Sequence, residues 1–287
     1  KCNFKYTSKN LKIPCFFHNL KGYDSHIIVT ALMKRFGDVQ IIPQSYEKYI
    51  GFWSNSGKMM FKDSFAFLSE SLDKLVRNLY HSNGVGGFPS MRAEFGKNAD
   101  FLCRRKGVFP YDDFSSFEWL NKTEFPPIEA FYSKLYDAKC KQDDYDYGKA
   151  VFERFCTTMR DYHDLYLKVD VLQLADCFES FRDLSLGFYK LDPVHYFTSP
   201  GLSWDAYLKQ KKTHVELIGD IDIHNFIERG KRGGMSMIRL RYAKANNPYM
   251  EDYDPLQPIM YLMYWDMNNL YALAMVHPLP ASDFEFI

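Results

Sequence analysis

The first third of the chain alternates short apolar runs with stretches of helical spacing, and this alternation constrains the fold more than any other feature. Residues 13–17 form an apolar run typical of a buried strand, and residues 25–36 carry apolar side chains at the spacing of a helix. Further strands are predicted around 48–53 and 58–62, followed by a helix over 71–80. Strands that alternate with helices predict an α/β domain.

The middle of the chain is predicted to be loop-rich and then helical. Residues 81–100 are rich in Gly and Asn and are predicted to form a surface loop. Residues 111–148 are aromatic, acidic and contain Pro, and they are predicted to be irregular with short helices. Residues 149–186 have strong helical periodicity, and the clearest amphipathic stripe runs over 162–183. We place a domain boundary near residue 190.

Beyond this boundary, helices are predicted before a strand. The phrase Thr-Ser-Pro-Gly reads as a helix start, with Ser199 as the cap and Pro200 in the first turn. A helix over 201–211 and a second helix near 220–228 follow. A strand is predicted over 259–265, ending just before an acid.

Composition restricts the classes of function. Lys+Arg and Asp+Glu both number 36, so the net charge is zero, whereas a simple DNA-coating module is usually basic; any nucleic-acid surface must therefore be local. The aromatic share of 17% fits stacking on bases as well as an aromatic-rich core. The six cysteines form no C-x-x-C pair, which indicates reduced thiols in an intracellular protein. No apolar run approaches the roughly 18 residues of a membrane span.

The first chemical motif is FHNLKGYD, which ends at Asp24. Here a strand leads into a polar turn, and the turn ends in an acid that opens a helix. Metals that promote phosphodiester cleavage need carboxylates at such strand ends. A carboxylate that merely caps the helix is the more common explanation of this motif taken alone.

The second motif is YHDLYLKVD, which contains Tyr166 and Asp170. These residues are four apart on a predicted helix, so both project from one face. An acid that holds a metal, beside a phenol that orients water, suits two-metal hydrolysis. The alternative is a solvated Asp on an amphipathic helix with a half-buried Tyr.

The third motif, MYWDMNNLYA, places Asp266 after an apolar run that is predicted to be too apolar to lie on a surface. Between the second and third motifs lies a basic segment, residues 229–244, which has six cations and no acid. Its central Gly233-Gly234 would let the backbone approach a phosphate chain closely. A solvated basic strand is an equally good explanation of this segment.

The order and wording of these motifs together resemble the protein-primed family-B DNA polymerases. Within that family, the resemblance is to the polymerases of self-synthesising eukaryotic DNA transposons (Mavericks or Polintons) and related viruses. It rests on phrases that span nearly the whole chain: FHNLKGYDSHII, YHDLYLKVDVLQLAD, HYFTSPGLSWDAYL, KRGGMSMI, RYAKANNPYMEDYDP and DMNNLYALAM. The resemblance implies an α/β fold, with an RNase H-like 3′→5′ exonuclease domain over 1–190. A linker and the beginning of a polymerase palm follow over 191–287.

The resemblance also assigns exonuclease roles. Asp24 and Asp170 would be metal ligands, and Tyr166 would orient the attacking water. Asn19 and Tyr23 would contact the single-stranded primer end.

Two shorter matches add residues to this site. The phrase KGVF looks like the lysine motif of protein-primed exonucleases, with Lys106 near the scissile phosphate, although a plain loop lysine would fit the same phrase. Ser64 and Phe65 stand where the family places a further ligand of single-stranded DNA.

On the polymerase side, Asp266 matches the aspartate that binds the catalytic metals and, with Met267, the incoming nucleotide. Tyr271 matches the steric gate that rejects a ribose 2′-OH. The linker that holds the template strand is matched by Arg232, Gly233 and Gly234; the Tyr of the family's Tyr-x-Gly-Gly phrase is replaced by Lys231.

The implied cofactor is Mg²⁺ (or Mn²⁺) in two-metal sites, and the implied partners are primer-template DNA, a single-stranded 3′ end, dNTPs and a terminal priming protein. A transposon lifestyle implies a nuclear location. The family's Asp-x-Glu and Asp-Thr-Asp motifs are not among these residues, so we expect this fragment alone neither to polymerise nor to proofread efficiently. Two alternatives are a non-catalytic nucleic-acid-binding remnant of a transposon polymerase and a standalone RNase H-like nuclease.

Overall fold

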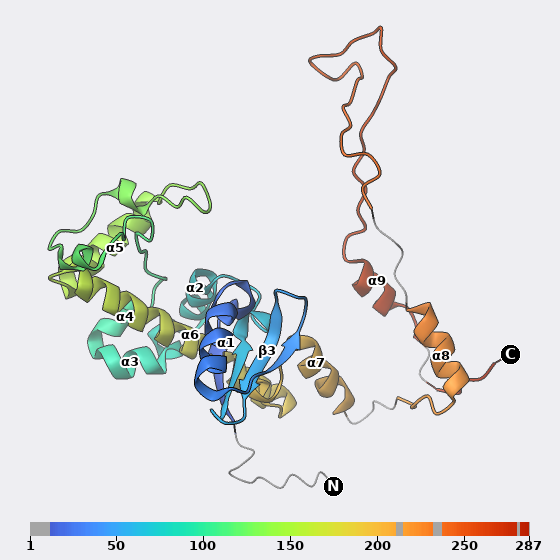
Figure 1. Ribbon diagram of the computed structural model, residues 1–287, viewed down its shortest axis with the longest axis horizontal. Coiled ribbons are helices and arrows are strands. Elements are labelled where there is room, and N and C mark those ends of the chain that lie inside the picture. The colour runs from blue at the N-terminus through green and yellow to red at the C-terminus, as the bar shows by residue number, and fades with distance from the viewer. Residues whose placement is uncertain (1–11, 211–214, 232–236, 280–281, 287) are drawn as a thin grey trace. The chain divides into compact units, whose positions relative to one another are not determined.

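The computed structural model describes residues 12–210, 215–231, 237–279 and 282–286 (Figure 1). The chain divides into two compact units between Lys209 and Gln210, and each is described by itself. The functional boundary near residue 190 stays a prediction, because compactness alone does not define a functional domain.

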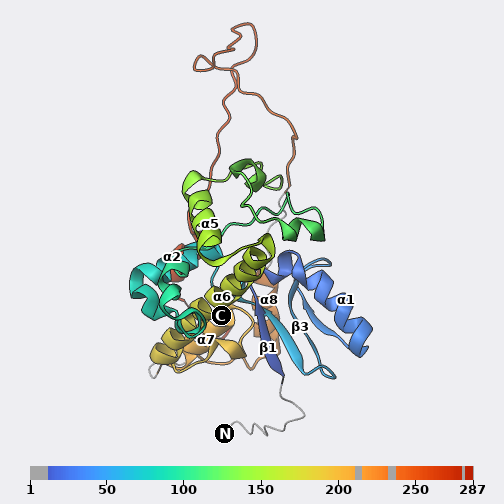
Figure 2. The same cartoon turned by 90° about the vertical axis from the view of Figure 1, so that its left-hand side faces the viewer.

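A mixed four-stranded sheet forms the first part of the larger unit, and with its helices it confirms the predicted α/β class. The order is β1-β4-β3-β2; β1 and β4 run parallel and the other neighbours antiparallel. Helix α1 packs against β3 (Figure 2). The element bounds are β1 Ile13–Phe17, α1 Asp24–Phe36, β2 Gln40–Pro43, β3 Tyr49–Ser54 and β4 Met59–Asp63. Strand β2 was not predicted, since its four residues at the sheet edge are too few to show a period.

The core under this sheet is small and largely aromatic. The rings of Phe52 and Phe61, on adjacent strands, stack with their centroids 5.0 Å apart. Leu20 and Leu32 complete the buried set, and they come from the turn after β1 and from α1. The apolar run of β1 therefore packs, with α1, over one compact centre.

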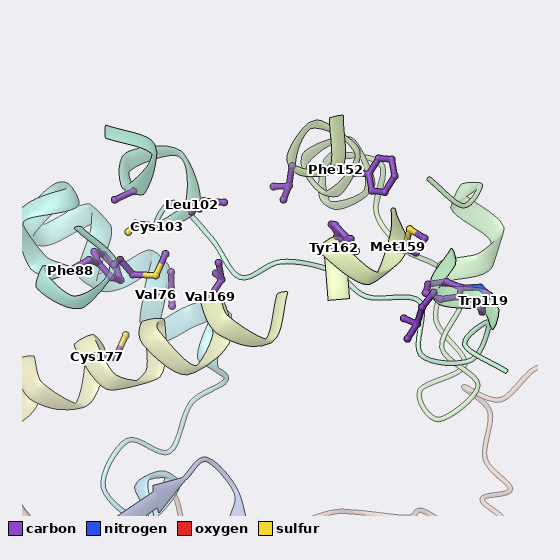
Figure 3. Packing of buried hydrophobic residues seen from close by; sticks show 14 residues of the cluster. Val76, Phe88, Leu102, Cys103, Trp119, Phe152, Met159, Tyr162, Val169 and Cys177 are labelled. Atoms are coloured by element: carbon purple, nitrogen blue, oxygen red, sulfur yellow. The ribbon is translucent and has the colours of Figure 1, made fainter. Parts of the chain in front are cut away.

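The helical part of the larger unit is built around α6, a helix of 31 residues. Its N-terminus is fixed by a capping box in which the side chains of Thr158 and Asp161 each accept from the other residue's backbone. Figure 3 shows the cluster of buried hydrophobic residues to which α6 contributes Val169 and Cys177. The helices are α2 Leu72–Asn83, α3 Pro89–Phe95, α4 Ala99–Leu102, α5 Gln142–Phe155 and α6 Met159–Tyr189.

The predicted loop over 81–100 is wrong, because α3 and α4 lie there and Phe88 and Met91 are fully buried. The reason is a distant partner. The buried carboxylate of Asp176 on α6 accepts hydrogen bonds from the backbone N–H groups of Ser90 (2.9 Å) and Met91 (3.0 Å). These are donors that a helix N-terminus leaves unpaired, so α6 supplies the cap that the local sequence lacks.

Two helix boundaries also differ from the prediction. The helical region 149–186 is two helices, interrupted after Phe155 where the backbone at Cys156 is extended. Helix α7 (Ser199–Leu208) begins where predicted, but Thr198 rather than Ser199 occupies the cap position. The Ser199 hydroxyl instead donates to the Ala66 carbonyl at 2.6 Å, and so ties α7 to the segment that follows β4.

In the smaller unit, α8 (Ile221–Gly230) and α9 (Leu270–Val276) are the described helices. The predicted strand over 259–265 does not form, and these residues are exposed. A strand needs a neighbouring strand for its backbone hydrogen bonds, and within the described residues only one bridge, Asn246 with Met260, is present there. Across the described residues, no helix has the length and apolar character that crossing a bilayer requires.

A buried lysine joins the sheet to the segment after α6. Lys62 on β4 is only 3% exposed, and its ammonium donates to the backbone carbonyls of Val194 and Tyr196, the latter at 3.0 Å. The ring of Phe197 lies over it, 4.7 Å from Nζ to the centroid. A Cβ at Gly51 would come within 2.8 Å of this ring, so glycine is required there. Burial lowers the pKa of Lys62 to about 8.

This pKa predicts that stability rises with alkaline pH. Between the folded pKa and the higher unfolded one, the unfolded state binds more protons, so raising the pH favours the folded state. From pH 7 to pH 9.5, Lys62 should contribute about 2 kcal/mol to this rise, and Lys62→Met should lack it. Denaturant titrations at both pH values test this. Lys74→Met is the control, because the Lys74 side chain on α2 is exposed. An equal rise in Lys62→Met and in the unmodified protein would contradict the prediction.

Candidate functional site

Three of the candidate residues lie together in the larger unit. Lys106 sits on the irregular segment after α4, while Tyr166 and Asp170 lie one turn apart on α6. The Lys106 ammonium donates to the Tyr166 hydroxyl at 2.6 Å and forms an ion pair with Asp170 Oδ2. Segments about 60 residues apart in sequence thus join a cation, a phenol and a carboxylate in one cluster, here called the lysine cluster.

The lysine cluster is partly desolvated. The side chains of Lys106 and Asp170 are 27% and 21% exposed, and Tyr166 is buried. Burial raises the pKa of Asp170, an effect that the Lys106 charge opposes. Burial, followed by the Asp170 charge, raises the pKa of Tyr166 far above its ordinary range, so the phenol stays protonated. It can therefore donate or accept a hydrogen bond at any ordinary pH.

One oxygen of Asp170 lacks a partner. Asp170 Oδ1 is buried and accepts no hydrogen bond from the described residues. An unsatisfied buried carboxylate oxygen is costly, and a hard divalent cation such as Mg²⁺ prefers this kind of ligand. The chemistry of Asp170 therefore fits a metal ligand. Within the described ranges, no three His, Cys, Asp or Glu side chains gather closely enough to hold an ion by themselves.

The sequence reasoning missed Tyr111, which completes the lysine cluster. Its hydroxyl lies 2.7 Å from the Tyr166 hydroxyl, while 68% of the residue is exposed. Its ring meets that of Phe109 edge-on at 5.3 Å. The position two residues beyond the KGVF phrase is the signal that would have found it, since an aromatic there is delivered to the same place as Lys106.

Close packing holds the irregular segment that follows α4 and carries Lys106, here called the Lys106 segment, against α6. A Cβ added at Gly107 would lie 3.1 Å from the Tyr166 ring, so a larger residue would push the segment away. The Lys106 backbone N–H donates to Asp73 Oδ1 at 3.1 Å, which joins the segment to α2. The sequence phrase KGVF therefore has a packing reason for its glycine.

A second group of candidates lies at the carboxyl ends of the parallel strands β1 and β4. Asp63, 2% exposed at the end of β4, accepts from the backbone N–H groups of Asn19 (2.8 Å) and Phe65 (2.9 Å). Ser64 is fully buried, and its hydroxyl donates to the Phe17 carbonyl at 3.0 Å. These bonds fix the turn after β1, in which Asn19 takes a left-handed conformation with φ of 65°.

This turn presents two of the predicted DNA contacts to solvent. Asn19 is exposed and Tyr23 is 70% exposed. Asp24 is the first residue of α1 and half-buried, but Tyr23 occupies the cap position, so Asp24 does not cap the helix. Among the described residues, Asp24 and Asp170 do not belong to a group of three or more His, Cys, Asp or Glu side chains that could hold a metal ion.

The polymerase-side candidates belong to the smaller unit. Asp266 and Met267 are exposed in an irregular stretch, and Tyr271, 86% exposed, lies in the first turn of α9. Arg232, Gly233 and Gly234 fall outside the described residues. Lys231, just before them, pairs with Glu228 at the end of α8.

Comparison with known proteins gives one match. The family model of DNA polymerase type B, organellar and viral, matches residues 3–287. No curated protein and no solved structure matches the chain.

The turn after β1 should depend on Asp63. Asp63→Ala leaves the N–H groups of Asn19 and Phe65 without their acceptor, and we expect a loss of about 2 kcal/mol in the free energy of unfolding. Amide exchange over residues 18–24 should accelerate. Asp38→Ala is the matched control, since Asp38 holds the separate turn at Asn55 in the same way. Equal exchange over 18–24 in both variants would show that Asp63 does not hold this turn.

Proposed function

The chain belongs to the organellar and viral type-B DNA polymerases, and from this membership we propose that residues 1–190 are part of a 3′→5′ proofreading exonuclease with an RNase H-like fold. Residues 191–287 are then the linker and the beginning of the polymerase palm. The activity of the family is DNA-directed DNA synthesis in DNA replication, with DNA and dNTPs as partners.

The observation that carries the exonuclease proposal is the lysine cluster. Hydrolysis of a phosphodiester needs a positive charge near the phosphate, a group that orients water and a carboxylate for a metal ion. Lys106, Tyr166 and Asp170 supply one of each, and they do so across two distant segments. At rest, the lysine offsets the carboxylate charge.

In the proposed reaction, a water oxygen attacks the terminal phosphorus, and the bond from phosphorus to the 3′ oxygen of the preceding nucleotide breaks. A nucleoside monophosphate leaves, and the shortened strand gains a proton at its 3′ hydroxyl. The Tyr166 hydroxyl orients the water by a hydrogen bond, and Lys106 neutralises charge on the phosphate oxygens. A divalent ion, Mg²⁺ or Mn²⁺, held by Asp170 and Asp24, would act as a Lewis acid on the phosphate.

The single-stranded 3′ end is proposed to bind beside this cluster. Tyr111 offers an exposed ring whose hydroxyl is anchored to Tyr166, an arrangement suited to stacking on a base. Exposed Asn19 and Tyr23, with half-buried Phe65, would contact the strand from the turn after β1. Buried Ser64 would act by holding that turn in place.

The finer assignments of the polymerase half rest on the sequence resemblance. We propose Asp266 as a metal ligand, Met267 as a nucleotide contact and Tyr271 as the steric gate. Arg232, Gly233 and Gly234 would hold the template strand. Protein priming, a Maverick or Polinton type of element and a nuclear location belong to the same proposal, and this chain would be a segment of the longer enzyme.

The exonuclease proposal is tested by degradation of single-stranded DNA in the full-length polymerase. Lys106→Met should slow degradation about 10²- to 10³-fold, because a charge that stabilises the transition state is lost. Asp170→Asn should slow it at least as much. Lys168→Met is the matched control. The Lys168 side chain is exposed on α6 and pairs with Glu94 rather than with the cluster. Unchanged degradation in Lys106→Met and Asp170→Asn would refute the exonuclease role. Loss of DNA synthesis together with loss of degradation would indicate misfolding.

The polymerase half is tested separately. Asp266→Asn should abolish dNTP incorporation and leave single-strand degradation at the unmodified rate, because the two sites use different carboxylates. Primer extension and degradation measured on one preparation give both rates. Retained incorporation in Asp266→Asn would remove Asp266 from the catalytic set. No incorporation by the unmodified full-length protein would favour the non-catalytic remnant instead.

A further inference from the structure

We propose that Gln173 is a positioning residue, which holds the Lys106 segment against α6 so that the lysine reaches Tyr166 and Asp170. The inference rests on the proposed exonuclease function. Gln173 lies one turn beyond Asp170 on α6 and is fully buried. Its side-chain amide donates to the backbone carbonyls of Leu102 (2.8 Å) and Arg105 (3.0 Å).

These two carbonyls bracket the point where the chain leaves α4 and becomes the Lys106 segment. Leu102 is the last residue of α4, and carbonyls at a helix C-terminus lack partners inside the helix. Gln173 uses both N–H donors of its amide to satisfy them, and its oxygen has no partner among the described residues. The position therefore uses glutamine as a double donor; an apolar side chain of equal volume would leave both carbonyls unpaired.

Gln173 is the most deeply buried of the groups that hold this segment. Others are Tyr162, which donates to the Val108 carbonyl at 2.6 Å, and two carboxylates: Asp73, which accepts from the Lys106 N–H, and Asp144, which pairs with the Arg105 guanidinium. Both carboxylates are partly exposed, at 40% and 27%. Solvent competes for the exposed carboxylate contacts and not for the Gln173 bonds, so the Gln173 bonds fix the start of the segment more firmly than the carboxylates do.

Helix α6 connects the Gln173 hydrogen bonds with the lysine cluster. Tyr166, Asp170 and Gln173 all project from α6, so one rigid element carries both partners of the Lys106 ammonium and the clamp on its backbone. The lysine side chain has several rotatable bonds, and it keeps one position only if its backbone is fixed. Gln173 would thus act through Lys106 without touching DNA.

The test is the rate at which a small acetylating reagent modifies each lysine at fixed pH, read by mass spectrometry. Gln173→Met keeps the volume and removes the donors, so Lys106 should leave its ion pair more often and react about five- to thirty-fold faster. Lys74 and Lys168, both exposed, should keep their rates. Lys62, buried in the sheet, reports the fold and should stay unreactive.

Cys177→Ala is the matched control. Cys177 is buried one turn further along α6 and packs in the core without a hydrogen bond to the Lys106 segment. Its truncation lowers stability, but it should leave the rate of Lys106 modification unchanged. The proposal is overturned if Lys106 reacts at the unmodified rate in Gln173→Met, if Cys177→Ala accelerates it equally, or if Lys62 becomes reactive in parallel with Lys106.

Single-strand degradation by the full-length polymerase separates this proposal from the exonuclease assignment. If both hold, Gln173→Met lowers kcat more than it changes KM, because Lys106 is assigned to the transition state, whereas Tyr111, Asn19 and Tyr23 are assigned to strand binding. Faster Lys106 modification with normal degradation would support the positioning role and refute the catalytic role of Lys106. Slower degradation with unchanged Lys106 modification would refute the positioning role alone.

Discussion

Buried polar side chains on one face of α6 determine where the neighbouring segments lie. Buried polar groups are stabilised by hydrogen-bond partners, and each of these side chains bonds a group on another segment. Tyr162 donates to the Val108 carbonyl at 2.6 Å, and Asp170 pairs with Lys106. Gln173 holds the end of α4, and Asp176 caps α3. An apolar face would allow several packings of similar energy, whereas each of these bonds allows one.

The ion pair between Lys106 and Asp170 also explains how the site exists before any ligand arrives. Two opposite charges in a partly desolvated place stabilise each other, and removing either one would leave an uncompensated charge. A phosphate could replace Asp170 as the partner of the lysine only if another cation took the place of the lysine at Asp170. Substrate and metal binding would then be coupled, since each supplies the charge that the other displaces. The Tyr166 phenol, which accepts a hydrogen bond from the Lys106 ammonium, lies at the same place.

The sequence predicted those features whose cause is local. The strands at 13–17 and 58–62, the helix from residue 25 and the one-turn spacing of Tyr166 and Asp170 follow from periodicity. Features with a distant cause were missed: α3 depends on a carboxylate 86 residues away, and the cluster position of Tyr111 depends on a partner 55 residues away. Gln173 interrupts an apolar stripe, and its role is visible only once Leu102 and Arg105 are placed.

In the smaller unit, the motif that contains Asp266 is specific in sequence, but few contacts among the described residues hold it. Its described hydrogen bonds are mostly local: Asn246 donates to the carbonyls of Asp254, Gln257 and Pro258, at most 12 residues away. The apolar residues 259–265 stay exposed, and contacts among the described residues do not fix Asp266 in place. Apolar burial and strand pairing are what would hold such a carboxylate rigidly. The lysine cluster is held by α2 and α6, so its geometry supports a mechanism more strongly than the position of Asp266 does.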